Sequence, residues 1–499
     1  MSGPPSPVSH LFSFDNSYAR DLPGSWAPAT PAAVPAPELL HFNVALAEEL
    51  GLDAAELNSV RGARILSGNE VPEGAQPIAQ AYAGHQFGGF SPQLGDGRAI
   101  LLGEVIDRQG RRRDIALKGS GRTAFSRRGD GKAAVGPMLR EYVMGEAMHA
   151  LGIPTTRALA VVGTGETVVR EQLLPGAVLT RVAASHIRVG TFEYFAARGD
   201  FDHVRALADY AIARHDPQLA DRPERYLAWL AAVAERQAVL LAQWMLVGFI
   251  HGVMNTDNMA VSGETIDYGP CAFMEAFDPK AVFSSIDAGG RYAYRNQPAI
   301  AQWNLTRFAE TLLPFIAGGV EEHAVAAATE VLQAFAARYE AHWLAGLRAK
   351  LGLGGEDAGD AALAADWLVL LETQAVDFTL AWRRLADAAA GRPERLQALF
   401  QDPGALGVWL ARWRDRSAAE RDGTTAQGDA MRRVNPIYIP RNHLVEAALT
   451  AASDRGDLAP FERLLEAVTR PFDEREGFEI YATPAPAEIT AGYKTFCGT

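Results

Sequence analysis

The pattern of apolar and polar residues divides the chain into a first part with short strands and a longer part with helices. In the first part, residues 99–106 (AILLGEVI) form an apolar run typical of a buried strand, and residues 114–118 (DIALK) alternate apolar and polar side chains. Asp107–Gly110 lies between them and is predicted to form a hairpin turn. A second hairpin is predicted within residues 157–174, with its turn at Gly163–Glu166.

A helix is predicted between these two hairpins. It begins at Pro137, because proline is favoured at the start of a helix, and it ends at Gly152. Beyond about residue 180 apolar residues recur at helical spacing, so the second part of the chain is expected to be mainly helical. The first 80 residues are rich in proline and include a helical stretch near His41–Leu50. We expect them to pack on the following unit as an extension.

These elements predict an α+β protein with two lobes. An N-terminal extension covers residues 1–80, a small sheet-plus-helix lobe covers 81–175, and a large helical lobe with a C-terminal extension covers 176–499. A chain of 499 residues is too long for one ordinary core and suits a bilobed enzyme. The arrangement of the small lobe is that of a protein-kinase N-lobe, which is the predicted fold class.

Composition narrows the expected partners. The chain has 47 Lys and Arg against 60 Asp and Glu, and this net charge of -13 argues against a nucleic-acid partner. The N-terminus lacks the basic and apolar regions of a secretory signal. The longest apolar stretch, Ala238–Ile250, is short and interrupted by Gln243, so it predicts a buried helix and no membrane partner. We expect a cytoplasmic monomer.

The order of chemical groups in the first lobe also resembles that of protein kinases. A glycine-rich segment (AGHQFGGFSPQLGDGR) precedes the first strand, the second strand ends in Lys118, and the following helix carries glutamates. Glycines, lysines and acidic helices are common, however, so by itself Lys118 could equally be a solvated lysine at a strand end.

The second part of the chain supplies a more specific pattern. HGVMNTDN ends at Asn258, and DYG follows at Asp267–Gly269. In kinases an asparagine at the end of the catalytic loop and the aspartate of a DFG motif bind Mg²⁺, so Asn258 and Asp267 are candidate metal ligands. Mg²⁺ prefers oxygen ligands and takes the rest from phosphate and water. The alternative is a capping loop followed by a hairpin turn.

One position departs from the kinase pattern. Val253 occupies the place where small-molecule kinases of this type carry the aspartate that accepts the hydroxyl proton. A valine cannot accept a proton, so either the protein is inactive or another carboxylate serves. Asp257 is the candidate for that role, and its alternative role is that of a turn or capping aspartate.

Long segments of the chain resemble the selenoprotein O family, whose bacterial members are called YdiU-type proteins. The resemblance runs from FDNSYARDLPG through LKGSGRTAFSRRGDGKA and HGVMNTDNM to NPIYIPRNHLVE near the C-terminus. Members of this family have kinase-like motifs but act as protein adenylyltransferases. The resemblance implies that ATP binds inverted, that AMP is transferred to Ser, Thr or Tyr hydroxyls of proteins, and that pyrophosphate leaves.

The resemblance also assigns roles to residues. It implies that Glu141, not Glu146, pairs with Lys118, that Asp257 accepts the proton, and that Asn258 and Asp267 hold Mg²⁺, with Mn²⁺ as a possible substitute. The residues implied to contact ATP are Gly95, Gly97, Arg98, Lys118, Asp130, Gly131, Arg181, Arg188 and Asp267.

Guanidinium groups suit phosphate oxygens, which supports the two arginines in this set. Arg181 and Arg188 are seven residues apart, so they would share one face if their segment were helical. Their alternative role is that of surface ion-pair residues.

Two cysteines, Cys271 and Cys497, are too few for a disulfide scaffold. Cys271 lies just after DYG and Cys497 lies in the C-terminal tail, so a regulatory disulfide between them is one hypothesis. A buried inert Cys271 with a free tail thiol is the other.

Three alternatives to AMP transfer stay open at this stage. The chain could transfer UMP from UTP with Mn²⁺, since no residue identified here recognises the base. It could be a phosphotransferase that uses Asp257 as the base, acting on a small molecule or a protein. It could also be a nucleotide-binding scaffold without activity.

Overall fold

An antiparallel sheet forms the centre of the first lobe in the computed structural model, which describes residues 11–418, 424–490 and 492–496. Its strand order is β1-β3-β6-β7-β10-β9-β2, and β8 pairs with β10 beside this path. The strands of this sheet are β1 (Trp26–Pro28), β2 (Glu38–Phe42), β3 (Ile78–Gln80), β6 (Ala99–Ile106), β7 (Arg112–Lys118), β8 (Ala133–Ala134), β9 (Arg157–Val169) and β10 (Leu173–Ala183).

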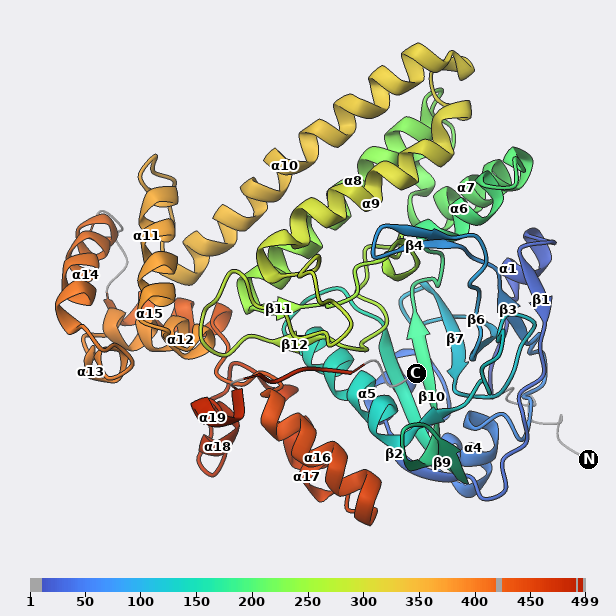
Figure 1. Cartoon of the computed structure of the whole chain (residues 1–499), viewed down its shortest axis with the longest axis horizontal. Coiled ribbons are helices and arrows are strands. Elements are labelled where there is room, and N and C mark those ends of the chain that lie inside the picture. The colour runs from blue at the N-terminus through green and yellow to red at the C-terminus, as the bar shows by residue number, and fades with distance from the viewer. Residues whose placement is uncertain (1–10, 419–423, 491, 497–499) are drawn as a thin grey trace, which may run out of the picture.

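Two small two-stranded sheets lie outside this sheet. One pairs β4 (Gly84–Gln86) with β5 (Gly89–Ser91), and the other pairs β11 (Phe249–Ile250) with β12 (Ala272–Phe273). Both lie close to the boundary between the lobes (Figure 1).

The β6–β7 hairpin confirms its prediction. Its turn is closed by the Gly110 amide, which donates to the Asp107 carbonyl at 2.9 Å. Gly110 has a φ of 77°, a left-handed conformation that favours glycine. The register places Lys118 opposite Ala99 at the end of the hairpin, beside the boundary between the lobes.

The turn predicted for the second hairpin at Gly163–Glu166 is wrong. Strand β9 continues through that segment, and Val169 still pairs with Leu173 of β10. The chain turns at residues 170–172 instead, where the Arg170 amide donates to the Gln172 carbonyl at 3.0 Å. A register shift between Pro175 and Ala177 of β10 accommodates the extra residues of β9 around Gly163 and Gly165. These glycines therefore lie in an irregular part of the strand and not in a turn.

The first 80 residues contribute strands to the sheet, which their proline-rich composition did not indicate. β2 pairs with β9, and β1 pairs with β3, which in turn pairs with β6. The helix expected near His41–Leu50 is therefore shorter, because residues up to Phe42 belong to β2 and the helix begins only at Val44. Its cap is the Asn43 side chain, which accepts the Leu46 amide.

The helices of the first part surround this sheet. They are α1 (Ser17–Asp21), α2 (Val44–Glu49), α3 (Ala54–Leu57), α4 (Val60–Leu66) and α5 (Val135–Ala150). The helix predicted from Pro137 is α5, which begins two residues earlier. It is buried on nearly all sides because it packs against β9 and β10 and against two helices of the C-terminal extension, α16 and α17 (Figure 1).

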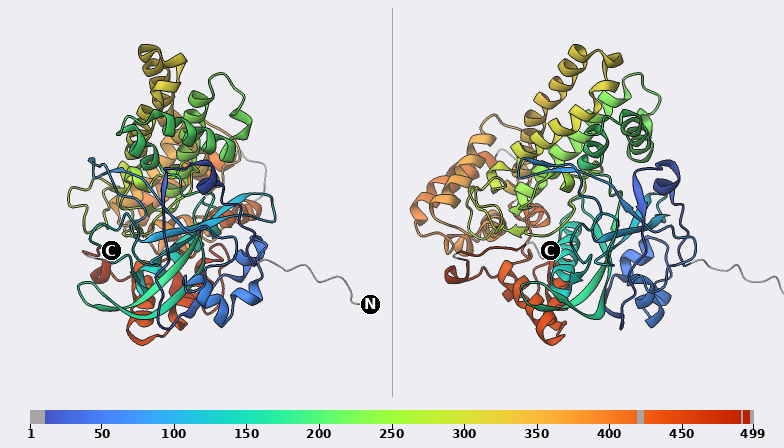
Figure 2. Two further views of the ribbon diagram at one scale, coloured as in Figure 1. Left: turned by 90° about the vertical axis from the view of Figure 1, so that its right-hand side faces the viewer. Right: turned by 45° about the vertical axis from the view of Figure 1, so that its right-hand side comes forward.

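The second lobe is mainly helical, as predicted. Its helices are α6 (Val189–Ala196), α7 (Phe201–His215), α8 (Arg225–Val247), α9 (Gln297–Leu312), α10 (Glu321–Leu351), α11 (Asp360–Thr373), α12 (Phe378–Ala389), α13 (Glu394–Gln397), α14 (Pro403–Ser417), α15 (Thr424–Val434), α16 (Asn442–Arg455), α17 (Ala459–Val468), α18 (Glu479–Ala482) and α19 (Ala487–Thr490). Helices α8, α9 and α10 extend away from the sheet, and Figure 2 shows the same separation of the two lobes from other directions. The α+β, bilobed, kinase-like prediction is confirmed.

Helix α8 forms the core of the second lobe. By length and composition it could cross a membrane, but Trp229, Leu230 and Leu241 are fully buried and α9 and α10 pack against it. This is the behaviour of a core helix, as the interrupted apolar stretch had indicated.

A buried ion cluster attaches the C-terminal extension to the second lobe. Arg441 is fully buried, and its guanidinium donates to both carboxylate oxygens of Asp377 at 2.6 and 3.1 Å. It also pairs with Glu275, which follows the DYG segment. The cluster thus holds three distant segments together.

Replacing Arg441 by Met is expected to destabilise the protein by about 3–5 kcal/mol, because two carboxylates would be left buried without their cation. Urea unfolding measures this loss. Arg455→Met is the matched control on the same helix, since the Arg455 side chain is 63% exposed, and it should change the stability by less than about 0.5 kcal/mol. Equal effects of the two variants would contradict a structural role for the buried cluster.

Candidate functional site

A cavity of about 760 Å³ lies between the sheet lobe and the helical lobe. Its size suits a small-molecule ligand. The loop His251–Asn258 corresponds in position to the catalytic loop of kinases and is called the catalytic loop below. This loop and the DYG segment contribute Val253, Asp257, Asn258 and Asp267 to the cavity wall. The first lobe and the start of the second contribute the other predicted residues, namely Gly95, Gly97, Arg98, Lys118, Asp130, Gly131, Arg181 and Arg188. Glu141 alone of the predicted set lies behind the wall.

Lys118 connects the two lobes through its ammonium group. The strand β7 ends at this residue, and Nζ lies 2.6 Å from Glu141 Oε2 of α5 and 2.7 Å from Asp267 Oδ1. Glu146, the competing glutamate, instead forms two hydrogen bonds of 2.6 Å with Arg157. The expected pairing of Lys118 with Glu141 is therefore present in the structure.

The helical geometry considered for Arg181 and Arg188 is wrong. Arg181 belongs to strand β10, and Arg188 is the residue before α6. They nevertheless converge on one carboxylate, because Arg181 Nη2 lies 2.5 Å from Asp267 Oδ1 and Arg188 Nη2 lies 3.5 Å from Asp267 Oδ2. The strand-to-helix connection brings them together where a single helix was considered.

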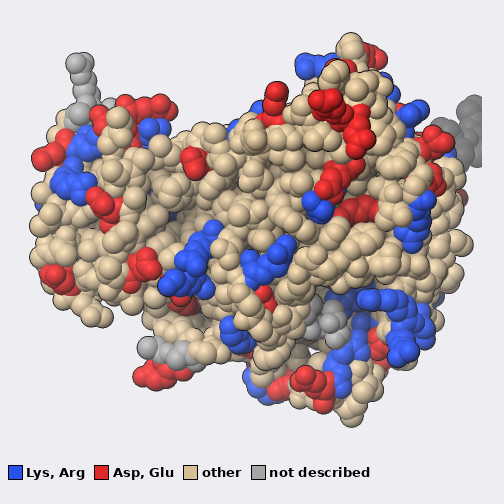
Figure 3. Space-filling model, turned by 45° about the horizontal axis from the view of Figure 1, so that its top comes forward, with Lys and Arg blue, Asp and Glu red and all other residues tan. Residues whose placement is uncertain are grey.

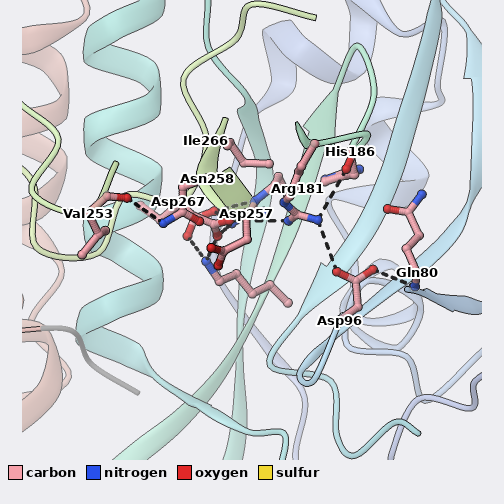
Figure 4. A network of polar contacts seen from close by, with 12 residues as sticks. Gln80, Asp96, Arg181, His186, Val253, Asp257, Asn258, Ile266 and Asp267 are labelled. Carbon is pink, nitrogen blue, oxygen red and sulfur yellow. Dashed lines mark hydrogen bonds and ion pairs between the residues drawn. The ribbon is translucent and has the colours of Figure 1, made fainter. Parts of the chain in front are cut away.

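Asp267 is the centre of this charge cluster (Figure 4). Burial alone would raise the pKa of its carboxyl group, but Arg181, Lys118 and Arg188 hold that pKa well below its usual range. Burial would also raise the pKa of Glu141, but Arg181 and Lys118 lower it. Asp267 therefore stays ionised at neutral pH and keeps the charge that a divalent cation requires.

The catalytic loop places Asn258 beside this aspartate. Residues Thr256–Asn258 form a short 3₁₀ turn, and the Asn258 amide group donates to the Val253 carbonyl at 2.9 Å. That bond orients the side chain and leaves its oxygen as the available ligand atom. Asn258 and Asp267 together fit a hard cation such as Mg²⁺ that takes further ligands from phosphate and water.

No cluster of three or more His, Cys, Asp or Glu side chains suited to a metal occurs within residues 11–418, 424–490 and 492–496. The two ligands predicted for this site are one amide, of Asn258, and one carboxylate, of Asp267. The donor set thus matches a metal that arrives with a nucleotide better than a metal held by the protein alone.

Asp257 lies on the same turn, and its carboxyl group is in a different environment. Burial raises its pKa to about 6, although a hydrogen bond from Gln86 opposes that rise. Val253 also lines the cavity and provides no acidic group there. Asp257 is thus placed where a proton acceptor would be needed, next to the candidate metal ligands.

The glycines before β6 allow close packing against the insertion that follows β7. Gly95 has a φ of 73°, and the Phe125 ring occupies the space that a Cβ atom would need. The Ser126 hydroxyl donates to the Gly97 carbonyl at 2.5 Å. The loop that carries Arg98 is thereby held at the cavity wall.

Asp130 and Gly131 lie at the exposed edge of the cavity. The Asp130 carboxylate accepts two hydrogen bonds from Arg170, at 2.9 and 3.1 Å. Gly131 has a φ of 72° and lies against the Gly121 backbone, so no side chain fits there.

On the face shown in Figure 3, Lys and Arg side chains form separate clusters with Asp and Glu between them.

Three residues of the site were not predicted. Gln86 contacts Asp257, Asp96 lies 3.6 Å from Arg188, and the Arg188 guanidinium lies over the Tyr82 ring at 4.4 Å. Gln86 and Asp96 come from the glycine-rich segment before β6, and Tyr82 directly precedes it; the segment was interpreted only as a kinase-like glycine-rich loop. Its aromatic and amide residues were the available signal.

Cys271 is fully buried, and burial raises the pKa of its thiol to about 11. The predicted partner Cys497 lies outside the described residues, so the disulfide stays a prediction. The described part of the tail does approach this region, because the Thr495 hydroxyl donates to the Pro270 carbonyl at 2.6 Å.

A lysine–glutamate pair, a loop asparagine and a following aspartate, gathered between a sheet lobe and a helical lobe, define a protein-kinase-like enzyme. The family model described as "Protein adenylyltransferase SelO" matches residues 12–469. The chain belongs to this family and is a nucleotidyltransferase.

Relatives in three organisms are similar over almost their whole length, and each is called "Protein nucleotidyltransferase YdiU". The relative from Chromobacterium violaceum is 66% identical over 96% of this chain and 100% of its own. The relative from Cereibacter sphaeroides is 63% identical over 98% and 100%. The relative from Rhizobium johnstonii is 59% identical over 98% and 97%.

The two buried glutamates of α5 provide a test of the site. Glu141→Gln should weaken binding of a Mg²⁺–nucleotide complex about tenfold or more. Without the Glu141 charge, Lys118 and Arg181 would pair with Asp267 alone and compete with the metal for its carboxylate. Titration calorimetry measures the dissociation constant. Glu146→Gln is the matched control: it also breaks a buried glutamate–arginine pair but should leave nucleotide affinity unchanged. Equal weakening by both would show that the effect is one of stability alone.

Proposed function

We propose that this protein transfers AMP from ATP to Ser, Thr or Tyr hydroxyls of other proteins. The observation that carries the proposal is the position of the acidic group on the catalytic loop. Val253 occupies the place where kinases have the aspartate base, and the buried Asp257 lines the cavity instead. Asn258 and Asp267 line the same cavity. The family description and the names of the relatives support this class of reaction.

The cations at Asp267 support an inverted nucleotide. Lys118, Arg181 and Arg188 are buried and converge on Asp267 in the cavity wall. Such a group of donors suits the β- and γ-phosphates, which leave together as pyrophosphate in AMP transfer. The α-phosphorus would then lie nearer to Asp257.

The reaction needs few groups. The acceptor hydroxyl oxygen forms a bond to the α-phosphorus, the bond from that phosphorus to the bridging oxygen of the β-phosphate breaks, and Asp257 takes the hydroxyl proton. Arg181, Arg188 and Lys118 stabilise the charge that develops on the pyrophosphate. A divalent cation at Asn258 and Asp267 would neutralise phosphate charge when bound. Mg²⁺ fits these ligands, and Mn²⁺ is an alternative.

Labelled nucleotides test the proposal. With a mixture of candidate acceptor proteins, ATP labelled at the α-phosphate should give acid-stable label on protein, and ATP labelled at the γ-phosphate should give none. Label from the γ-phosphate alone would establish a kinase instead, and no label despite nucleotide binding would establish a scaffold. The same assay with α-labelled UTP and Mn²⁺ determines whether UMP is preferred.

Asp257→Asn should lower kcat for AMP transfer by about 100-fold or more, because the amide has the same shape but cannot accept the proton. Nucleotide affinity should change little, since Asp257 pairs with none of the three cations at Asp267. Steady-state kinetics together with calorimetry separate the two effects. Retention of the wild-type kcat would contradict the role given to Asp257.

A further inference from the structure

The β4–β5 hairpin is attached to the catalytic loop and not to the main sheet. Its two strands pair only with each other among the strands described. The His85 amide donates to the Thr256 hydroxyl at 2.7 Å, and the Phe87 amide donates to the Asn255 side chain at 3.2 Å. The hairpin therefore takes its position from the loop that precedes Asn258.

A buried carboxylate reinforces this attachment. Glu193 of α6 is only 5% exposed, and its two oxygens bond the His85 ring and the Thr256 hydroxyl. The Tyr292 hydroxyl bonds Asn255 at 2.6 Å and accepts the Phe87 amide at 3.0 Å. Hairpin, loop and α6 thus form one hydrogen-bonded unit, which is suited to holding a side chain in a fixed orientation.

Gln86 lies at the end of β4 in this unit, and its side chain reaches Asp257. Its amide nitrogen donates to Asp257 Oδ2 at 3.1 Å. The other oxygen, Oδ1, is buried and has no hydrogen-bond partner. A Cβ atom on Gly84 would lie 2.7 Å from that oxygen, so the Gly84 backbone closes this side of the carboxylate. The hairpin therefore fixes both oxygens, one by a donor and one by contact.

We propose that Gln86 is a positioning residue for Asp257, and that the β4–β5 hairpin supplies the orientation of this carboxylate. The assignment rests on the proposed function, in which Asp257 accepts the acceptor proton. A neutral amide suits this task because it holds a carboxylate without the strong charge pairing that an arginine or lysine would impose. Lys118, Arg181 and Arg188 meanwhile pair with Asp267.

Gln86→Met tests the assignment, because methionine has a similar length but cannot donate. We expect kcat for AMP transfer to fall about 10–100-fold, as a catalytic group that loses its orientation does. The KM for ATP should stay within about twofold, since Gln86 contacts none of the cations that would bind phosphate. Gln86→Glu should lower kcat at least as much, because it places a second carboxylate against Asp257.

Gln93→Met is the matched control, since it changes the same residue type on the same segment at an exposed position. It should leave both constants unchanged. A second comparison uses Asp257→Asn as the background. If Gln86 acts through Asp257, Gln86→Met should cause no further loss there, whereas a general structural effect would multiply with the first loss.

The possible outcomes distinguish failure of the proposed function from failure of the role given to Gln86. Failure of the wild-type protein to transfer a nucleotide would overturn the proposed function and this assignment with it. Transfer by the wild type with an unchanged kcat in Gln86→Met, or an equal loss in Gln93→Met, would overturn the assignment alone. A fall in kcat confined to the Gln86 variants and absent in the Asp257→Asn background supports it.

Discussion

The site depends on one half-buried carboxylate, that of Asp267, which is shared among three cations. Asp267 contacts Lys118 from the sheet, Arg181 from the next strand, and Arg188 at the start of α6. Without them, partial burial would raise the pKa of this carboxyl group. With them it stays ionised, and it also fixes how the sheet, the first helix of the second lobe and the DYG segment lie relative to one another.

Helix α5 holds the same segment from a second side. Glu141 reaches Lys118 and Arg181, while the adjacent Arg140 donates to the Cys271 carbonyl at 2.6 Å and to the Gly269 carbonyl at 3.2 Å. Neighbouring residues of one helix thus hold both the charged residue of the DYG segment and the backbone that follows it. Asp267 is therefore held in position by protein groups before any nucleotide binds, which favours a preorganised site.

Much of the site was predictable because the relevant residues occur in a fixed order along the chain. The strand that ends in Lys118, the helix that carries Glu141, and the spacing of Asn258 and Asp267 indicated an ion pair that is present and two candidate metal ligands that line the same cavity. The role proposed for Asp257 rests on a single departure from the kinase pattern, because valine at 253 cannot act as a base. These interpretations used local patterns, the order of elements and the family resemblance.

Other features could not be predicted, because they depend on contacts between segments far apart in the sequence. The turn at residues 170–172 lies beyond glycines that have a high turn propensity, and only pairing with β10 and β2 makes that region a strand. Arg181 and Arg188 converge because a strand and a helix meet, which residue spacing does not indicate. Likewise, Arg441 gives no sign in the sequence of being fully buried between two carboxylates.

The β4–β5 hairpin was predictable in part from local sequence and depends in part on contacts with distant segments. Its glycines indicate a close approach of the backbone, yet the sequence does not reveal what is approached. In the structure the answer is Asp257, since Gly84 leaves room for one carboxylate oxygen and Gln86 bonds the other. In a kinase the glycine-rich loop is a cover for phosphates. Here part of the corresponding segment lies on the loop that carries Asn258, so the hairpin contacts the carboxylate that we propose takes the place of the base absent at Val253.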